Sequence, residues 1–96
     1  MNSETNCKVY AREIEIRNQL GIHARPASLF VKIASRYDAD ITVEKGDSRV
    51  SGKSIMGLMT LAASRGTRLR IMAEGEDAED ALDELTTLIE NNFDEE

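Results

Sequence analysis

The chain has one histidine, His23, which lies where a loop is expected to give way to a helix, and Arg25 follows two residues later. An imidazole is nucleophilic near neutral pH, and histidine forms covalent intermediates. The first N–H groups of a helix have no partner within it, and with the helix dipole they favour a bound anion. A guanidinium adds a charged, forked donor that suits phosphate oxygens. The spacing thus makes His23 a candidate phosphorylatable histidine, with Arg25 stabilising the phosphate.

Two other interpretations of His23 stay open on spacing alone. The side chain could merely cap the helix, because the anion-site argument applies to many helices. An enzyme could use His23 as a general base, which needs an orienting carboxylate and a pocket that excludes water, and no acidic residue lies near it in sequence. A metal centre is disfavoured, because His23 and Cys7 match no zinc pattern. We expect a carrier without a cofactor rather than an autonomous catalyst.

Hydrophobic periodicity predicts the elements that position these residues. Strands are expected over 9–16, 40–44, 49–51 and 69–73. Helices are expected over 23–37, 55–63 and 77–93. Pro26 suits the first turn of the first helix, Ser54 suits the N-cap of the second, and Gly66 is expected to end that helix in a left-handed conformation.

This β-α-β-β-α-β-α order, with a hairpin in the middle, predicts an α+β fold. Three helices would cover one face of a four-stranded antiparallel sheet and leave the other face in solvent, as an open-faced sandwich. We divide the chain into a leader (1–8), one domain (9–93) and an acidic tail (94–96).

Composition narrows the range of partners and locations. The 96 residues suit one small domain, so chemistry is expected at the surface. Eighteen acidic against twelve basic residues give a net charge of −6, which disfavours nucleic acid and anionic lipid. Cys7 stands alone and is interpreted as an incidental thiol in a reducing compartment. The leader lacks a signal peptide and no apolar run could span a membrane, so we predict a cytoplasmic protein.

Two motifs carry a resemblance to a known family. They are GIHARPA at 21–27 and GKSIMGLM at 52–59. With the element order, they resemble the HPr family, the histidine-containing phosphocarriers of the phosphoenolpyruvate-dependent phosphotransferase system. The resemblance runs from about Val9 to Phe93. It implies that His23 takes phosphate from an enzyme I type phosphotransferase and donates it to an EIIA-type domain, with Arg25 assisting. It also implies that Ser54 is a regulatory target of an HPr kinase/phosphorylase.

The loop before His23 departs from the sugar-transport pattern. Those members typically carry Asn-Gly before the apolar residue and the histidine, whereas this chain has NQLGIH at 18–23. That run and the ending NNFDE at 91–95 resemble the nitrogen-related branch, NPr. The branch leaves an alternative open, in which the same fold is a regulatory module whose phosphorylation state is read by target proteins.

The second helix is more apolar than one buried stripe requires. Leu58 and Leu61 are assigned to the core. The remaining apolar residues near the two motifs are assigned to a partner-docking patch: Leu20, Ala24, Ile55, Met56 and Met59. Methionine is flexible and suits a carrier with successive partners. We expect the carrier itself to be a monomer.

Overall fold

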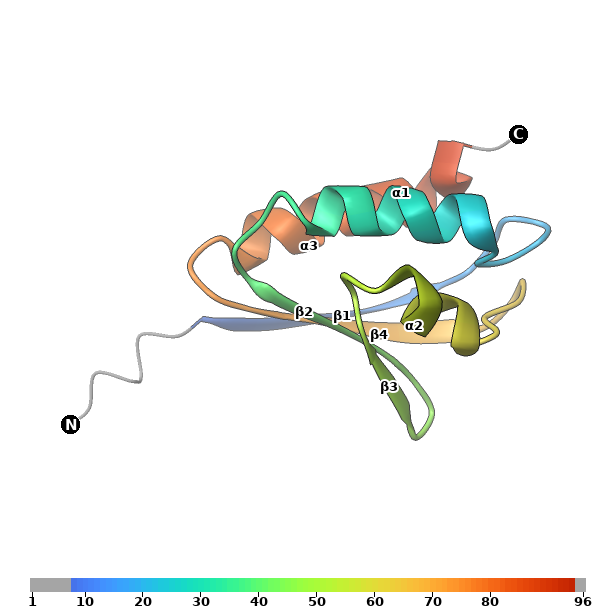
Figure 1. The fold of residues 1–96 in the computed structure, drawn as a ribbon, viewed down its shortest axis with the longest axis horizontal. Coiled ribbons are helices and arrows are strands. Elements are labelled where there is room, and N and C mark those ends of the chain that lie inside the picture. Colours follow the sequence, from blue (N-terminus) through green and yellow to red (C-terminus); the bar gives the residue numbers. More distant parts are fainter. Residues whose placement is uncertain (1–7, 95–96) are drawn as a thin grey trace.

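The computed structural model of the chain describes residues 8–94, so Cys7, the rest of the leader and the last two residues of the acidic tail lie outside it. Figure 1 shows a layer of helices over a sheet. In chain order the elements are β1 (Val9–Glu15), α1 (Ala24–Ala34), β2 (Asp40–Lys45), β3 (Ser48–Ser51), α2 (Ile55–Thr60), β4 (Arg68–Glu74), α3 (Ala78–Glu90) and the short 3-10 turn η2 (Asn92–Asp94).

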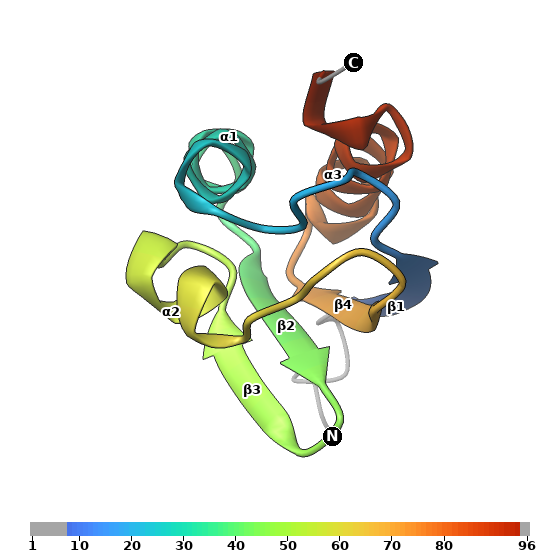
Figure 2. The same ribbon diagram turned by 90° about the vertical axis from the view of Figure 1, so that its right-hand side faces the viewer.

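The four strands form one antiparallel sheet in the order β1-β4-β2-β3. The three α-helices cover one face of it, as Figures 1 and 2 show from two sides. The predicted open-faced sandwich is therefore confirmed. On the uncovered face the register places Glu13, Arg70, Glu44 and Arg49 side by side across all four strands. Opposite charges on neighbouring strands stabilise such a solvated face.

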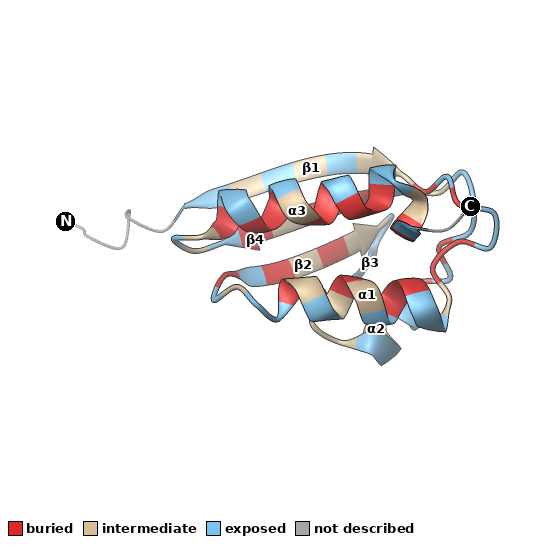
Figure 3. Cartoon of the chain, turned by 90° about the horizontal axis from the view of Figure 1, so that it is seen from above, coloured by how far each residue is buried: buried red, intermediate tan, exposed pale blue. Residues whose placement is uncertain are grey.

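The core lies between the sheet and the helices. Alternate strand residues such as Leu69 and Ile71 point inward, and α1 and α3 turn a buried stripe toward them, which Figure 3 shows in red. The largest fully buried side chains are Phe30, Phe93, Ile16, Leu58, Leu69, Ile71, Leu82, Leu85 and Ile89. This single core fixes the positions of both ends of α1 and of the loop that precedes it.

The predicted helix over 55–63 is too long, because α2 ends at Thr60. The backbone turns left-handed soon afterwards at Ala62 (φ 52°), whereas Gly66, the predicted terminator, adopts a positive φ of 92° within the following loop. The ammonium group of Lys45 donates to the carbonyl oxygens of Leu61 and Ala62 at 3.0 and 3.3 Å. These carbonyls therefore have a partner outside the helix.

The other two helices are also shorter than predicted. Helix α1 ends at Ala34, and the chain continues through turns that place Tyr37 against α3. There the Tyr37 hydroxyl donates to the carboxylate of Glu84. Helix α3 ends at Glu90, after which Asn92, Phe93 and Asp94 all have positive φ values of 55–61°. This reversal of the chain carries the buried Phe93 ring back into the core.

No helix within residues 8–94 is long and apolar enough to cross a membrane.

Candidate functional site

His23 is the N-cap residue of α1, with extended backbone angles (φ −104°, ψ −163°) and a half-buried side chain. Its carbonyl oxygen accepts the N–H of Ala27 at 3.0 Å and so begins the helix. Within the described part of the chain, its imidazole makes no capping hydrogen bond to the helix. The interpretation of His23 as a side-chain cap is therefore wrong. The imidazole lies instead at the helix start, where first-turn N–H groups favour an anion.

The loop before His23 is held by two sets of hydrogen bonds. Asn18 is buried, and its side-chain amide donates to the Gly21 carbonyl oxygen at 2.8 Å. The N–H of Ile22 donates to the Ala63 carbonyl oxygen at 2.9 Å, which joins the loop to the connection between α2 and β4. Gly21 has a φ of +69°, and a β-carbon there would lie 2.3 Å from the Ala63 oxygen. Only glycine fits this approach without a shift.

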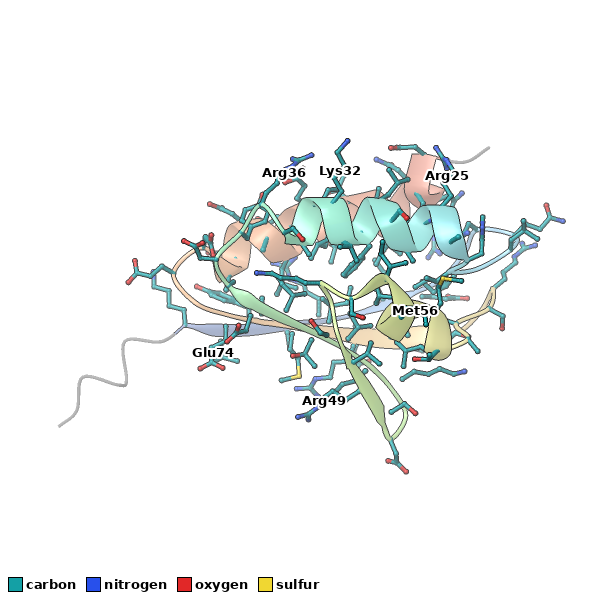
Figure 4. All side chains as sticks on the ribbon, viewed as in Figure 1. Arg25, Lys32, Arg36, Arg49, Met56 and Glu74 are labelled. Atoms are coloured by element: carbon teal, nitrogen blue, oxygen red, sulfur yellow. The ribbon has the colours of Figure 1, made fainter. Side chains whose placement is uncertain are left out.

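Arg25 is exposed on the first turn of α1, and Figure 4 shows it at the end of the helix near the C-terminal turn. Its Nη1 donates to the carbonyl oxygen of Phe93 at 3.4 Å. Two further exposed arginines, Arg17 and Arg65, flank the backbone hydrogen bond from Gly66 to Ile16 at this end of the sheet. Arg25 is thus the arginine that the fold places on the first turn of the helix that His23 begins.

Ser54 lies where the sequence predicts it, at the N-cap of α2. Its Oγ accepts the N–H of Gly57 at 2.9 Å, so the capping role is confirmed. Gly57 also allows close packing against β3, because a β-carbon there would lie 3.1 Å from that of Val50. Ser54 is half-buried at the start of a helix whose other side chains, apart from Thr60, are apolar or absent.

Apolar side chains near the two motifs divide as the sequence predicts. Leu58 and Leu61 are buried, whereas Leu20 is 72% exposed, Met56 74%, Met59 41% and Ile55 40%. Ala24 is also exposed, on the first turn of α1. Helices α1 and α2 pack against each other, and Figure 4 shows Met56 on the same side of the molecule as Arg25. We call Leu20, Ala24, Ile55, Met56 and Met59 the exposed apolar patch.

Two hollows of the surface lie on the sheet, and His23 lines neither of them. One of about 370 Å³ is lined by Glu13, Glu44 and Arg70 and another of about 520 Å³ by Asp40, Thr42 and Ser51, all on strands. Among the described residues, no group of three or more histidine, cysteine or acidic side chains could hold a metal ion. The feature that suits an anion at His23 is the start of α1.

Comparison with known proteins decides the family. The family model described as "PTS HPr component phosphorylation site" matches residues 10–91. The chain belongs to the HPr family. Phosphocarrier protein HPr of Pseudomonas aeruginosa is 50% identical over 88% of this chain and 96% of its own. HPr-like protein Crh of Bacillus subtilis is 44% identical over 82% and 93%. The crystal structure of an HPr from Thermoanaerobacter tengcongensis, 48% identical, covers 91% of this chain and 98% of its own with a TM-score of 0.87.

Sequence reasoning did not anticipate two contacts in this HPr-family site. Phe93 lies far from Arg25 along the chain, so only the folded backbone shows that its carbonyl reaches the guanidinium. Lys45 ends a strand and looks like a solvated charge in the sequence, yet its ammonium group binds the turn that supports the His23 loop. Both contacts join residues that are far apart in sequence, so local patterns along the chain gave no sign of them.

Proposed function

We propose that this HPr-family phosphocarrier accepts a phosphoryl group on His23 from an enzyme I type phosphotransferase and passes it to an EIIA-type domain. A bond forms from an imidazole nitrogen to phosphorus as the donor's bond to phosphorus breaks, and the reverse exchange loads the acceptor. Phosphoryl transfer relies on positioning and electrostatics. The observation that carries the proposal is the position of His23 at the N-cap of α1, with Arg25 exposed on the first turn of the same helix.

The exposed apolar patch supports docking next to this site. Its four large side chains, Leu20, Ile55, Met56 and Met59, together leave an apolar surface on α2 and the His23 loop in contact with water. Exposed apolar patches with polar surroundings commonly mark protein interaction sites. We assign this patch to the contact with the donor and acceptor proteins in turn.

Ser54 is proposed as a second, regulatory phosphate site for an HPr kinase/phosphorylase. Its hydroxyl caps α2, whose exposed residues belong to the patch. A phosphate would add about −1.5 to −2 charges at a helix N-terminus, which tolerates negative charge. We therefore expect regulation by altered docking rather than by unfolding.

A regulatory role remains a second candidate, because the chain carries Leu20 beside the site and resembles NPr there. Phosphocarrier protein NPr of Shewanella violacea is 38% identical over 88% of this chain. In that role a target protein would read the state of His23 without removing its phosphate. The two roles separate experimentally, since a carrier loses its phosphate to an EIIA-type domain and a regulator keeps it while bound.

A monomeric state stays a prediction, as does a cytoplasmic location. Related structures are described as dimers, one of HPr from Thermoanaerobacter tengcongensis and one of a swapped, intertwined Crh. Light scattering after size exclusion would decide between one copy and two for this chain.

A relay assay tests the proposal. The protein is incubated with phosphoenolpyruvate, an enzyme I and an EIIA-type domain, and phosphate on the EIIA is measured with and without the carrier. We expect transfer that needs the wild-type carrier and is lost in His23→Ala. Phosphate that reaches His23 but stays there would favour the regulatory candidate, and transfer by His23→Ala would refute the assignment of His23.

A further inference from the structure

Lys45 is the last residue of β2 and is half-buried at the turn into β3. Its Nζ donates to the carbonyl oxygen of Leu61 at 3.0 Å and to that of Ala62 at 3.3 Å. Both acceptors belong to the chain immediately after α2, which is far from Lys45 along the sequence. A single ammonium group thus fixes the end of α2 to the end of a central strand.

The turn that Lys45 binds is a conformationally unusual one. Ala62 has a φ of +52°, a left-handed conformation that residues with a β-carbon adopt rarely. The carbonyl groups of Leu61 and Ala62 come after the end of α2, so they have no partner within that helix. Charge-assisted hydrogen bonds are stronger than those between neutral groups. Removing the ammonium group would therefore leave the turn free to relax toward ordinary backbone angles.

The same turn supports the loop before His23. The next carbonyl along the chain, that of Ala63, accepts the N–H of Ile22 at 2.9 Å. Gly21 packs on that oxygen so closely that a β-carbon would clash with it. Ile22 is the residue immediately before His23. Any displacement of residues 61–63 is consequently passed to the backbone that sets the position of the imidazole.

We propose that Lys45 is a positioning residue for phosphoryl transfer, acting through the Leu61–Ala63 turn on the loop that carries His23. The effect on phosphoryl transfer rests on the proposed function of His23. The claim that Lys45 holds the loop before His23 in place does not depend on that function. Phosphoryl transfer is sensitive to placement, and a small displacement of a reacting group lowers rates substantially. Lys45 itself does not touch the phosphate in this assignment.

The test compares Lys45→Met, which keeps the length of the side chain but no donor, with Lys45→Arg, which keeps the charge and several donors. Lys8→Met is the matched control, because Lys8 is an exposed lysine before β1, at the opposite end of the sheet from His23. The hydrogen-exchange rate of the Ile22 amide measures how often the loop before His23 opens, and that of the Ile71 amide measures how often the sheet opens. Phosphorylation of His23 by enzyme I gives kcat/KM.

In Lys45→Met we expect exchange of the Ile22 amide to accelerate about tenfold while exchange of the Ile71 amide stays unchanged, and kcat/KM to fall about tenfold. Lys45→Arg is expected to remain within about twofold of wild type on both measurements. Unchanged Ile22 exchange and unchanged transfer in Lys45→Met would overturn the proposal, as would equal losses in Lys8→Met.

If Lys45→Met does not fold, a second measurement on the wild-type protein tests the proposal. In that event the wild-type protein is examined by NMR for contacts between the Lys45 Cε protons and the protons of Ala62, which are expected and whose absence would overturn it. If wild-type His23 takes no phosphate, the proposed function fails. The Ile22 exchange of Lys45→Met then still decides whether Lys45 positions the loop.

Discussion

The guanidinium of Arg25 donates to the carbonyl oxygen of Phe93 at 3.4 Å, across 68 residues of sequence. The contact joins the first turn of α1 to the end of the chain just beyond α3. It is possible because three successive residues of η2 are left-handed and reverse the chain over the core. The residue proposed to stabilise a phosphate on His23 is thereby kept near the helix start before phosphate arrives.

The forked shape of Arg25 is expected to matter as well as its charge. Arg25→Lys keeps one positive charge but presents it as a compact ammonium that cannot bind two oxygens in a plane. We expect kcat for phosphorylation of His23 to fall about tenfold or more, with little change in the free energy of unfolding because Arg25 is exposed. Single-turnover kinetics with phosphorylated enzyme I would measure the rate of His23 phosphorylation. Wild-type kinetics in Arg25→Lys would refute a role for the fork.

If the exposed apolar patch is a docking surface, a substitution within it should weaken binding to enzyme I without lowering the stability of the fold. Met56→Ser removes an apolar side chain that is 74% exposed, so the free energy of unfolding should change by about 0.5 kcal/mol or less. The KM for enzyme I should nevertheless rise roughly fivefold to tenfold if Met56 is a docking contact.

Val9→Ser is the matched control for Met56→Ser. Val9 is 58% exposed at the start of β1, away from the site. Its replacement should leave KM unchanged. Equal effects of the two substitutions would mean that the patch has no special part in docking.

The capping and regulatory roles of Ser54 can be told apart by two substitutions. Ser54→Ala loses the acceptor for the Gly57 N–H and should destabilise the fold by about 1 kcal/mol in urea unfolding. Ser54→Asp retains an acceptor and adds charge, so it should unfold nearly as wild type does while His23 is phosphorylated more slowly. An unaltered phosphorylation rate in Ser54→Asp would contradict regulation by charge at this position.

Stability at alkaline pH should depend on Tyr37. The hydrogen bond from its hydroxyl to Glu84, followed by burial and by the charge of Glu84, raises the pKa of Tyr37 from 10.0 to about 12. The folded state therefore holds this proton more tightly than the unfolded state. The stabilisation is complete below pH 10 and is lost as the pH rises towards 12.

Tyr37→Phe provides the comparison for this alkaline loss. The variant lacks the titrating hydroxyl, so its free energy of unfolding should fall less than that of wild type between pH 9 and pH 12. Denaturant unfolding at a series of pH values would measure the difference. Parallel curves for the two proteins would show that Tyr37 does not cause the loss.

The parts of this structure that the sequence predicted are those set by local patterns. Alternation and helical spacing gave the order of the strands and helices, and Ser54 was recognisable as a cap because capping involves residues only three positions apart. Exposure of Met56 followed from an apolar excess on a short helix.

The parts that sequence reasoning missed depend on tertiary contacts. Helix α2 ends three residues early where Lys45 binds the following carbonyls, and nothing in residues 55–63 signals that partner. Helix α1 stops at Ala34, beyond which Tyr37 reaches Glu84 on another helix. The approach of Phe93 to Arg25 likewise depends on the packing of α3 against α1. Such contacts are decided by the assembled core, which periodicity along the chain does not describe.

The central claim is that His23 carries the phosphate, and mass spectrometry of the protein after incubation with phosphoenolpyruvate and enzyme I tests it most directly. We predict one phosphate per chain, mapped by peptide fragmentation to His23, lost on brief acid treatment and absent from His23→Ala. A folded wild-type protein that gains no phosphate, or one whose phosphate resists acid and maps to another residue, would contradict the account.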